Sequence, residues 1–289
     1  MSKLASILRL TRIEHSVMLV VAVVAAEIIA YGIPALPVFA LSLVTPIFIS
    51  MAAFAINDYF DVKVDRANRK KRPLVTGELT KAEALYITAI CLVVGIGASA
   101  FINTYAFYIA VIFGALALLY SYRLKEMLFW GNAYIAFSMA IPFIFGDYVV
   151  TNVMVPGILL VSAMIFLAGL AREIHGTIRD MKGDGKVRNV VSFPKVIGVA
   201  ASAALALVLY SAAIVISFYL FVFVQPFASN LLYGIIVLAS VDIILVYLSI
   251  AYLYRSGQRF YDCARDLSLQ AMALALVAIL LSAIIPLYI

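Results

Sequence analysis

The sequence predicts an all-α polytopic membrane protein with nine transmembrane helices. Its 289 residues are 66% hydrophobic and only 12% charged, whereas a soluble domain averages about 45–50% apolar and about 25% charged residues. Several apolar runs reach the length of about 20 residues that a helix needs to cross a bilayer. The Lys and Arg residues fall in alternate loops between these runs, as is typical of polytopic membrane proteins. We therefore expect residues 1–289 to form a single membrane domain.

Nine apolar segments predict the transmembrane helices, and Gly, Pro and Asn residues between them mark the breaks. The segments are 15–33, 38–60, 82–102, 105–121, 131–150, 154–175, 194–223, 230–253 and 267–288. Asp262 and Asp266 are expected to begin the last helix, where a carboxylate interacts favourably with the helix dipole. Before the first span, residues 1–12 place Lys3, Arg9 and Arg12 around apolar side chains, which predicts a short helix lying on the membrane surface.

The basic residues also predict how the chain is oriented in the membrane. All 21 Lys and Arg residues fall in the segments 1–12, 63–81, 123–125, 172–195 and 255–265. The alternate loops, near 33–38, 102–105, 147–154 and 223–230, contain no Lys or Arg. Because short loops rich in Lys and Arg stay on the cytoplasmic side, we expect a cytoplasmic N-terminus and a C-terminus on the opposite side.

The net charge and the cysteines argue against nucleic-acid binding and against a structural disulfide or zinc site. In this topology the net charge of +6 belongs to one membrane face. It therefore indicates anionic lipid headgroups or a diphosphate as partners rather than nucleic acid. Cys91 and Cys263 lie in different helices without metal-ligand spacing, so they indicate neither a disulfide framework nor a zinc site.

The second predicted helix runs into a first acidic motif. Asp58, Asp61 and Asp65 follow Asn57, and at about 100° per residue the three carboxylates lie within about 60° of one another on the helix surface. Like charges so close repel one another, and their burial is costly without a counter-ion. Mg²⁺ suits such a site because it binds carboxylate, water and phosphate oxygens. The alternative is a solvated helix end, with the basic run 66–72 acting only as a topology signal.

A second acidic motif follows the sixth predicted helix. Glu173, Asp180 and Asp184 are spaced i, i+7 and i+11, which places them on one face if the helix continues. Gly183 and Gly185 are expected to end that helix. The predicted topology puts both motifs on the same side of the membrane. Two carboxylate clusters around a basic pocket would fit a Mg²⁺–diphosphate complex.

These residues resemble the motifs of the UbiA superfamily of intramembrane prenyltransferases. Residues 57–65 match its NDxxDxxxD motif after the second helix, and Asp180 and Asp184 match the DxxxD-type motif after the sixth. Residues 68–77 (NRKKRPLVTG) are similar to the loop after the first motif, and residues 120–125 (YSYRLK) to a third segment containing Tyr and Lys. The resemblance covers essentially the whole chain, and it implies nine helices around a central cavity.

Within the superfamily, the first motif and its loop are most similar to archaeal digeranylgeranylglyceryl phosphate synthases. The similarity implies Mg²⁺-dependent transfer of a geranylgeranyl group from its diphosphate to geranylgeranylglyceryl phosphate, a step of ether-linked phospholipid biosynthesis in archaea. Two departures keep an alternative open. Thr177 stands where that subgroup often has a further Asp, and residues 12–16 (RIEHS) are equally similar to members with aromatic acceptors. The alternative is therefore a polyprenyltransferase that acts on 4-hydroxybenzoate or a related quinone precursor.

The resemblance also implies a role for each motif residue. The expected catalytic residues are Asn57, Asp58, Asp61, Asp65, Tyr120, Lys125, Asp180 and Asp184, and the five aspartates are the expected Mg²⁺ ligands. The expected substrate contacts are Arg69, Arg72, Tyr122, Arg123, Glu173 and Lys182. We expect the allylic diphosphate to ionise, with Tyr120 or Tyr122 shielding the carbocation through a cation–π contact. The acceptor then captures the cation.

Two function classes besides a prenyltransferase fit parts of the sequence. Glu27 and Asp242 are predicted inside the membrane, where ionisable residues are often functional, so a transporter is one alternative. No repeat or broken-helix signature supports it. A non-catalytic lipid-binding scaffold is the other, and the density of metal-type carboxylates disfavours it. His175 is either a general base or a structural residue, and the sequence does not indicate the oligomeric state.

Overall fold

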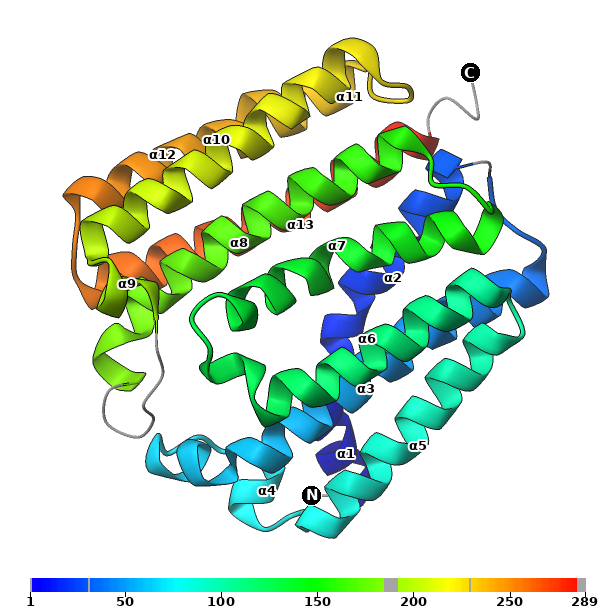
Figure 1. Ribbon diagram of the computed structural model, residues 1–289, viewed down its shortest axis with the longest axis vertical. Coiled ribbons are helices and arrows are strands. Elements are labelled where there is room, and N and C mark those ends of the chain that lie inside the picture. Colours follow the sequence, from blue (N-terminus) through cyan, green and yellow to red (C-terminus); the bar gives the residue numbers. More distant parts are fainter. Residues whose placement is uncertain (1, 31, 185–191, 229, 285–289) are drawn as a thin grey trace.

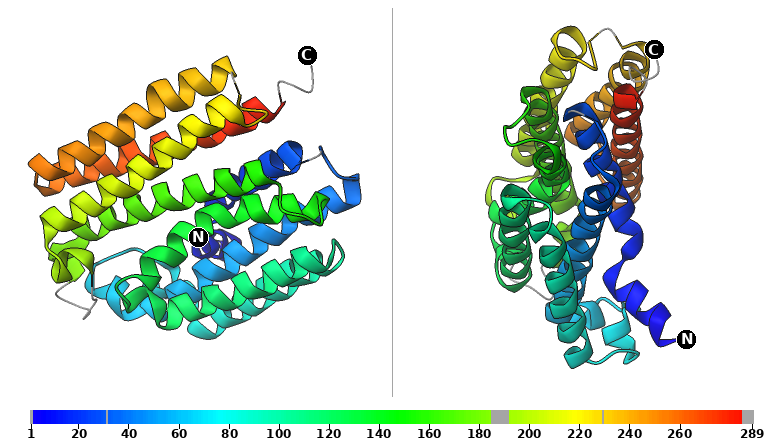
Figure 2. Two further views of the ribbon diagram at one scale, coloured as in Figure 1. Left: turned by 45° about the horizontal axis from the view of Figure 1, so that its top comes forward. Right: turned by 90° about the vertical axis from the view of Figure 1, so that its right-hand side faces the viewer.

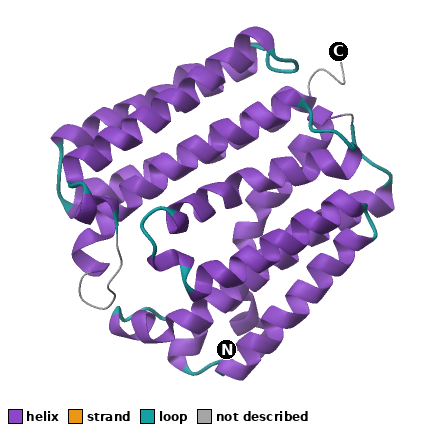
Figure 3. Ribbon diagram, viewed as in Figure 1, coloured by secondary structure: helices purple, strands orange, loops and turns teal. Residues whose placement is uncertain are grey.

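The computed structural model describes residues 2–30, 32–184, 192–228 and 230–284. The regular structure in these ranges is entirely helical (Figure 3). Within them, nine helices are long and apolar enough to cross a membrane. The all-α fold class and the nine spans that the sequence predicts are therefore confirmed.

The spans are formed by ten helical elements and a π-helical turn. They are α2 (Ile13–Ala30), α3 (Leu36–Ala67), α5 (Lys81–Ala100), α6 (Thr104–Tyr122), α7 (Trp130–Val150), α8 (Pro156–Asp184), α10 (Val199–Phe223), α11 (Leu231–Tyr233), α12 (Asp242–Tyr254) and α13 (Gln258–Ile284). The π-helical turn Gly234–Val241 joins α11 and α12 into one span. Shorter elements are α1 (Lys3–Thr11), α4 (Pro73–Thr76), α9 (Phe193–Val196) and a 3₁₀ turn at Leu124–Glu126.

Two expected boundaries are wrong, because polar helix extensions escape a prediction based on apolar runs. The second span was expected to end near residue 60, whereas α3 continues through the acidic motif to Ala67. The last span was expected to begin at residue 267, whereas α13 begins at Gln258. Asp262 and Asp266 therefore lie inside α13 rather than at its start. Aromatic packing at the start of α13 stabilises this extension, since the Tyr261 ring stacks on the Tyr252 ring of α12 with centroids 5.5 Å apart.

Polar caps fix the ends of the helices around the α5–α6 hairpin. Thr80 and Glu83 form a capping box at the start of α5, in which the Glu83 carboxylate accepts a 2.8 Å hydrogen bond from the Thr80 amide. Asn103 caps α6 by accepting a 2.8 Å bond from the Ala106 amide. The Asn103 side chain also donates to the carbonyl of Tyr148 at 2.6 Å. This bond ties the α5–α6 connection to the end of α7.

The spans form two layers of helices. In Figure 1, α10, α8, α7 and α6 lie in front of α12, α13, α2 and α3, and each front helix contacts the one behind it. The second view of Figure 2 shows the two layers edge-on, with α1 projecting to one side. In Figure 1, α1, α4, the 124–126 turn and the α12–α13 loop lie at the lower and left-hand ends of the spans. We call this side of the bundle the basic end, because most of the described Lys and Arg residues lie in or beside these segments.

Helix α1 docks on the protein at the basic end. Its residue Leu10 is fully buried against Val62 of α3 and Leu74 of α4. Two side chains of α1 also bind Glu78: Ser6 donates at 2.5 Å, and Arg9 forms an ion pair. Hydrogen bonds from Ser6, Arg9 and Thr76 lower the pKa of Glu78 from 4.5 to about 2. The expected short helix is present, and it is anchored to α3, α4 and the loop that follows.

Candidate active site

A large cavity runs between the two layers from the basic end into the bundle. Its volume is about 580 Å³, and its walls come from α2, α3, α6, α7, α8, α10, α12, α13 and the π-helical turn 234–241. Most of the lining is apolar, with side chains such as Leu19, Ile49, Phe143 and Leu276. The polar lining residues include Arg12, His15, Asn57, Tyr120, Tyr134, Arg172, Asp242 and Arg265. A cavity of this kind can hold a long apolar chain and keep a charged head at its mouth.

The three aspartates of the first motif lie beside the mouth of this cavity. α3 stays helical through the motif, so the carboxylates share one face as the spacing predicts. Asp58 is 1% exposed and Asp65 is 4% exposed, while Asp61 is half-buried. Buried carboxylates require compensating partners, and here those partners are basic side chains from three other segments.

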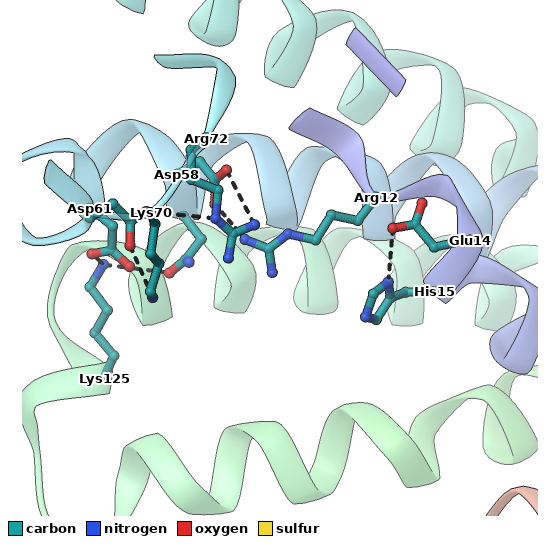
Figure 4. Close-up of polar contacts among 10 residues, drawn as sticks. Arg12, Glu14, His15, Asp58, Asp61, Lys70, Arg72 and Lys125 are labelled. Carbon is teal, nitrogen blue, oxygen red and sulfur yellow. Dashed lines mark hydrogen bonds and ion pairs between the residues drawn. The ribbon is translucent and has the colours of Figure 1, made fainter. Parts of the chain in front are cut away.

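Each carboxylate forms an ion pair with a different set of cations (Figure 4). Arg12 Nη2 lies 2.5 Å from Asp58 Oδ1, and Lys125 Nζ lies 2.6 Å from Asp61 Oδ1. Lys70 Nζ lies 3.0 Å from Asp65 Oδ1. Arg72 lies between two carboxylates, 3.8 Å from Asp58 Oδ2 and 3.9 Å from Asp65 Oδ2. The motif is therefore an alternating cluster of acids and bases.

Backbone turns at two arginines bring these cations to α3. Arg69 has a φ of 54°, a left-handed conformation that reverses the chain after α3. The reversal lets the Lys70 amide donate to the Asp65 carbonyl at 2.9 Å and carries Arg72 back over the motif. Arg12 has a φ of 46° at the junction of α1 and α2. Non-glycine residues in this region are strained, and such strain concentrates at functional sites.

The donor groups of the first motif fit a magnesium ion. Asp58 Oδ2 is buried and has no hydrogen-bond partner among the described residues. Carboxylate oxygens are the ligands that Mg²⁺ prefers, and one or two of them suffice when water and phosphate complete the octahedron. Within the described residues, no three His, Cys, Asp or Glu side chains group closely enough to hold one metal ion together. Instead, a Lys or Arg side chain lies beside each carboxylate of α3.

The second motif lies on α8, whose described residues extend to Asp184, next to Gly183, one of the two glycines expected to end the helix; Gly185 lies outside the described residues. Asp180 accepts two 2.7 Å hydrogen bonds from Arg179, and Glu173 accepts a 3.0 Å bond from Arg172. The side chains of Lys182 and Asp184 lie outside the described residues. The expected pairing of Asp184 with the first motif is therefore an untested prediction.

The third segment of the expected site, residues 120–125, is divided between the cavity and the surface. Tyr120 lines the cavity and stacks on Tyr134 of α7, with ring centroids 4.5 Å apart and planes at 22°. Lys125 follows in the 3₁₀ turn and reaches Asp61 of α3. Tyr122 is 65% exposed, Arg123 is exposed, and neither lines the cavity. The structure thus brings Tyr120 and Lys125 to the site, while Tyr122, whose ring contacts Phe60 of α3, and Arg123 lie outside the cavity.

The chain matches the sequence profile of the UbiA prenyltransferase family over residues 18–269. It belongs to the UbiA prenyltransferase family. The digeranylgeranylglyceryl phosphate synthase of Archaeoglobus fulgidus is 34% identical over 238 residues, which cover 82% of this chain and 80% of the relative. That of Thermococcus kodakarensis is 27% identical over 266 residues, covering 92% and 93% of the two chains.

Solved structures share the fold of this UbiA-family protein. One, from work on digeranylgeranylglyceryl phosphate synthase in membranes, superposes with a TM-score of 0.82 at 28% identity, covering 98% of this chain and 99% of the other. A UbiA homologue from Archaeoglobus fulgidus bound to GPP and Mg²⁺ superposes with a TM-score of 0.66 at 20% identity, covering 95% and 99%. The family, the fold class and the enzyme class that the sequence predicts are confirmed, and the chain is a multi-pass membrane prenyltransferase.

Three further ionisable residues of this UbiA-family protein have distinct surroundings. Glu27 is fully buried in α2, and neither carboxylate oxygen has a hydrogen-bond partner among the described residues. Asp242 lines the deep part of the cavity at the start of α12. His175 stacks on Tyr252 with centroids 3.7 Å apart and does not line the cavity. This placement favours a structural role for His175 over that of a general base.

Sequence reasoning assigned no site role to several polar residues at the cavity: Arg12 before α2, Tyr134 on α7, Arg172 on α8 and Arg265 on α13. The three arginines were counted as topology signals. Burial lowers the pKa of Arg12, although the neighbouring Asp58 opposes that shift. Basic residues that only set the membrane topology are normally solvated, whereas the Arg12 guanidinium is partly withdrawn from water. The sequence alone does not reveal this burial.

Proposed function

We propose that residues 1–289 form one catalytic domain that transfers a geranylgeranyl group from its diphosphate to geranylgeranylglyceryl phosphate. The observation that carries this proposal is a buried acid–base cluster at the mouth of an apolar cavity of about 580 Å³. The relatives named digeranylgeranylglyceryl phosphate synthase support this acceptor. The neighbours bound to GPP or DMAPP with Mg²⁺ support a prenyl diphosphate donor and this metal.

We assign the metal ligands to the two acidic motifs. Asp58, Asp61 and Asp65 would hold Mg²⁺ on α3, with Asn57 assisting. Asp180 and Asp184 would hold it on α8, with Glu173 assisting. When bound, the ion would act as a Lewis acid that stabilises negative charge developing on the phosphate oxygens. Asp58 Oδ2 supports this assignment, because it is buried, accepts no hydrogen bond among the described residues and has Arg72 only at 3.8 Å.

The basic residues of the cluster would bind the donor diphosphate. In the structure, Lys125 and Arg72 form ion pairs with the α3 carboxylates. A diphosphate carries more charge than a carboxylate and accepts forked hydrogen bonds from Arg. We therefore infer that Lys125 and Arg72 turn from the aspartates to the diphosphate when substrate binds, with Arg69 and Lys182 completing its neutralisation. Release of the carboxylates by these cations would free their oxygens for the metal.

The cavity would control the reaction of the prenyl group. The allylic C–O bond breaks, and its electron pair leaves with the diphosphate. The stacked pair Tyr120–Tyr134 lines the cavity, where the Tyr120 ring could stabilise the allylic cation through its π face. Apolar walls exclude water, so that the hydroxyl oxygen of the acceptor captures the cation, forms the new C–O bond and loses its proton. Tyr122 and Arg123, which lie at the surface, would serve substrate entry rather than chemistry.

The donor and the acceptor are tested together with purified enzyme and radiolabelled geranylgeranyl diphosphate. We expect labelled lipid when geranylgeranylglyceryl phosphate is the acceptor, and none when EDTA removes Mg²⁺. Equal amounts of 4-hydroxybenzoate should yield no labelled product. Product formed only from the benzoate would replace the ether-lipid assignment with an aromatic acceptor. Solute flux in liposomes without diphosphate release would favour a transporter.

We also infer that the N-terminus and the cavity mouth face the cytoplasm, because the basic end holds the Lys- and Arg-rich segments. Cys263 provides a test, since it is exposed near the start of α13 whereas Cys91 is buried. A membrane-impermeant maleimide should label Cys263 in inside-out vesicles and not in right-side-out vesicles. The reverse labelling pattern would contradict the proposed orientation. The variant Cys263→Ser is the control for labelling at Cys91.

A further inference from the structure

We propose that Arg172 and Arg265, which line the cavity across from Arg12, form a second anion subsite at the cavity mouth that binds the phosphate monoester of a lipid acceptor. The inference rests on the proposed function and deepens it, because it separates the acceptor headgroup from the donor diphosphate. None of these arginines belongs to the residues that the sequence motifs assign to the substrate.

All three side chains line the same cavity, although they come from three different elements. Arg12 lies at the junction of α1 and α2, Arg172 lies on α8, and Arg265 lies on α13. Like charges around one apolar cavity repel one another, and guanidinium groups in the membrane require compensation. The ion pair of Arg12 with Asp58 and that of Arg172 with Glu173 compensate these two only in part. An anion bound in the cavity would neutralise the remaining positive charge.

Unused hydrogen-bond donors indicate where that anion binds. The Nε atoms of Arg12 and Arg172 are buried and have no hydrogen-bond partner among the described residues. Arg265 is exposed at the cavity mouth, and among the described residues its guanidinium has no protein partner, so its donors are open to a ligand. A guanidinium carries five N–H donors in a fixed planar fork, and buried donors are normally paired. The unused donors of Arg172 and Arg265 on one cavity match the several oxygens of a phosphate group.

The subsite is distinct from the cluster that would bind the donor diphosphate. Lys70, Arg72 and Lys125 pair with the α3 carboxylates and do not line the cavity. α3 packs on α2, α5 and α6, whereas α13 packs on α2, α8 and α12. Figure 1 shows α2 and α7 between α3, α5 and α6 on one side and α8, α12 and α13 on the other. Arg172 and Arg265 therefore approach the cavity mouth from the side opposite the first acidic motif.

The charge of the subsite selects between acceptor classes. A phosphate monoester carries about −1.5 to −2 charges at neutral pH, which suits two or three arginines. An aromatic carboxylate carries a single negative charge and two oxygens, so it would leave most of these donors unpaired. With the donor diphosphate at the two acidic motifs and the acceptor phosphate at Arg172 and Arg265, the acceptor hydroxyl would lie near the allylic carbon of the donor. The arginines thus favour a phosphorylated lipid as the acceptor.

The variant Arg265→Gln tests this subsite, because Arg265 is exposed and its loss should leave the fold intact. Steady-state kinetics would measure KM for geranylgeranylglyceryl phosphate at saturating donor, and KM for geranylgeranyl diphosphate at saturating acceptor. Losing charged hydrogen bonds should raise the acceptor KM about tenfold or more, while the donor KM stays within about twofold. Arg172→Gln should act in the same direction. Arg265→Lys should recover only part of the affinity, because lysine lacks the planar fork.

The matched control is Arg259→Gln, which removes the same charge from the same helix at an exposed position away from the cavity. It should leave both KM values unchanged. A second readout compares binding of geranylgeranylglyceryl phosphate, geranylgeranylglycerol and inorganic phosphate: wild type should prefer the phosphorylated lipid, and Arg265→Gln should lose that preference. Competition by inorganic phosphate alone would indicate a free-phosphate site and overturn the lipid assignment. If wild type prenylates the phosphorylated acceptor but Arg265→Gln keeps its KM, the subsite is wrong and the proposed function stands.

Discussion

Replacing Asp61 with alanine should lower kcat by about a thousandfold or more, while the protein remains folded after extraction. Asp61 is the carboxylate that Lys125 holds at 2.6 Å, and the Lys125 side chain is only 7% exposed. The substitution removes a proposed metal ligand and leaves that buried ammonium without its carboxylate partner at 2.6 Å. Losing a single electrostatic group at an active site typically costs about 10²–10³ in kcat, and losing a metal ligand should cost at least as much. The measurement is the initial rate of labelled lipid formation at saturating Mg²⁺ and substrates.

The isosteric variant Asp61→Asn separates charge from shape. Its amide oxygen can still accept a hydrogen bond from Lys125, so the fold should be retained, but it is a poor Mg²⁺ ligand and the rate should fall almost as far. Asp262→Asn is the matched control, because Asp262 is an exposed carboxylate on α13 outside the proposed cluster. Size-exclusion profiles of all three variants should match wild type. A rate within about tenfold of wild type for Asp61→Ala would refute the assignment of Asp61 as a metal ligand.

The transmembrane helices could be predicted because two independent patterns agree in the sequence. Apolar runs mark the spans, and the alternation of Lys and Arg between loops confirms how many there are. The boundaries at the basic end were misjudged for a physical reason. α3 stays helical to Ala67 because Lys70, Arg72 and Lys125 neutralise its aspartates, and no apolar run reports such ion pairs.

The site was predictable where it depends on helical spacing and unpredictable where it depends on tertiary contact. Asp58, Asp61 and Asp65 share a face because three- and four-residue steps do so on any helix. The Arg12–Asp58 pair joins residues 46 positions apart in the chain, and the Tyr120–Tyr134 stack joins two helices. Arg265 looks like every other basic residue near a membrane surface until α13 is packed against α2 and α8. Such partners follow from packing and cannot be read from local pattern.

The second large effect is expected in the packing of α2 against α7, at Gly146. A Cβ atom added at Gly146 would lie 2.6 Å from the Val23 carbonyl oxygen and 2.9 Å from the Ala26 Cβ. Both neighbours belong to the rigid part of α2, so neither can move as a flexible side chain would. Overpacking of this kind costs typically about 1–3 kcal/mol, whereas replacing Gly by Ala in a helix gains at most about 1 kcal/mol. Gly146→Ala should therefore lower the free energy of unfolding.

Thermal unfolding of the protein in detergent provides the measurement, and Gly97 provides the control. A shift of about 2–4 °C in Tm per kcal/mol is typical of a domain this large, so Gly146→Ala should lower Tm by several degrees and Gly146→Leu should abolish a monodisperse folded peak. Gly97 is also helical, but no atom lies within 4 Å of its added Cβ, so Gly97→Ala should keep or raise Tm. Equal Tm values for Gly146→Ala and wild type would mean that α2 and α7 can separate without loss. In that case their close approach would not be what holds Phe143 and Phe145 against the cavity.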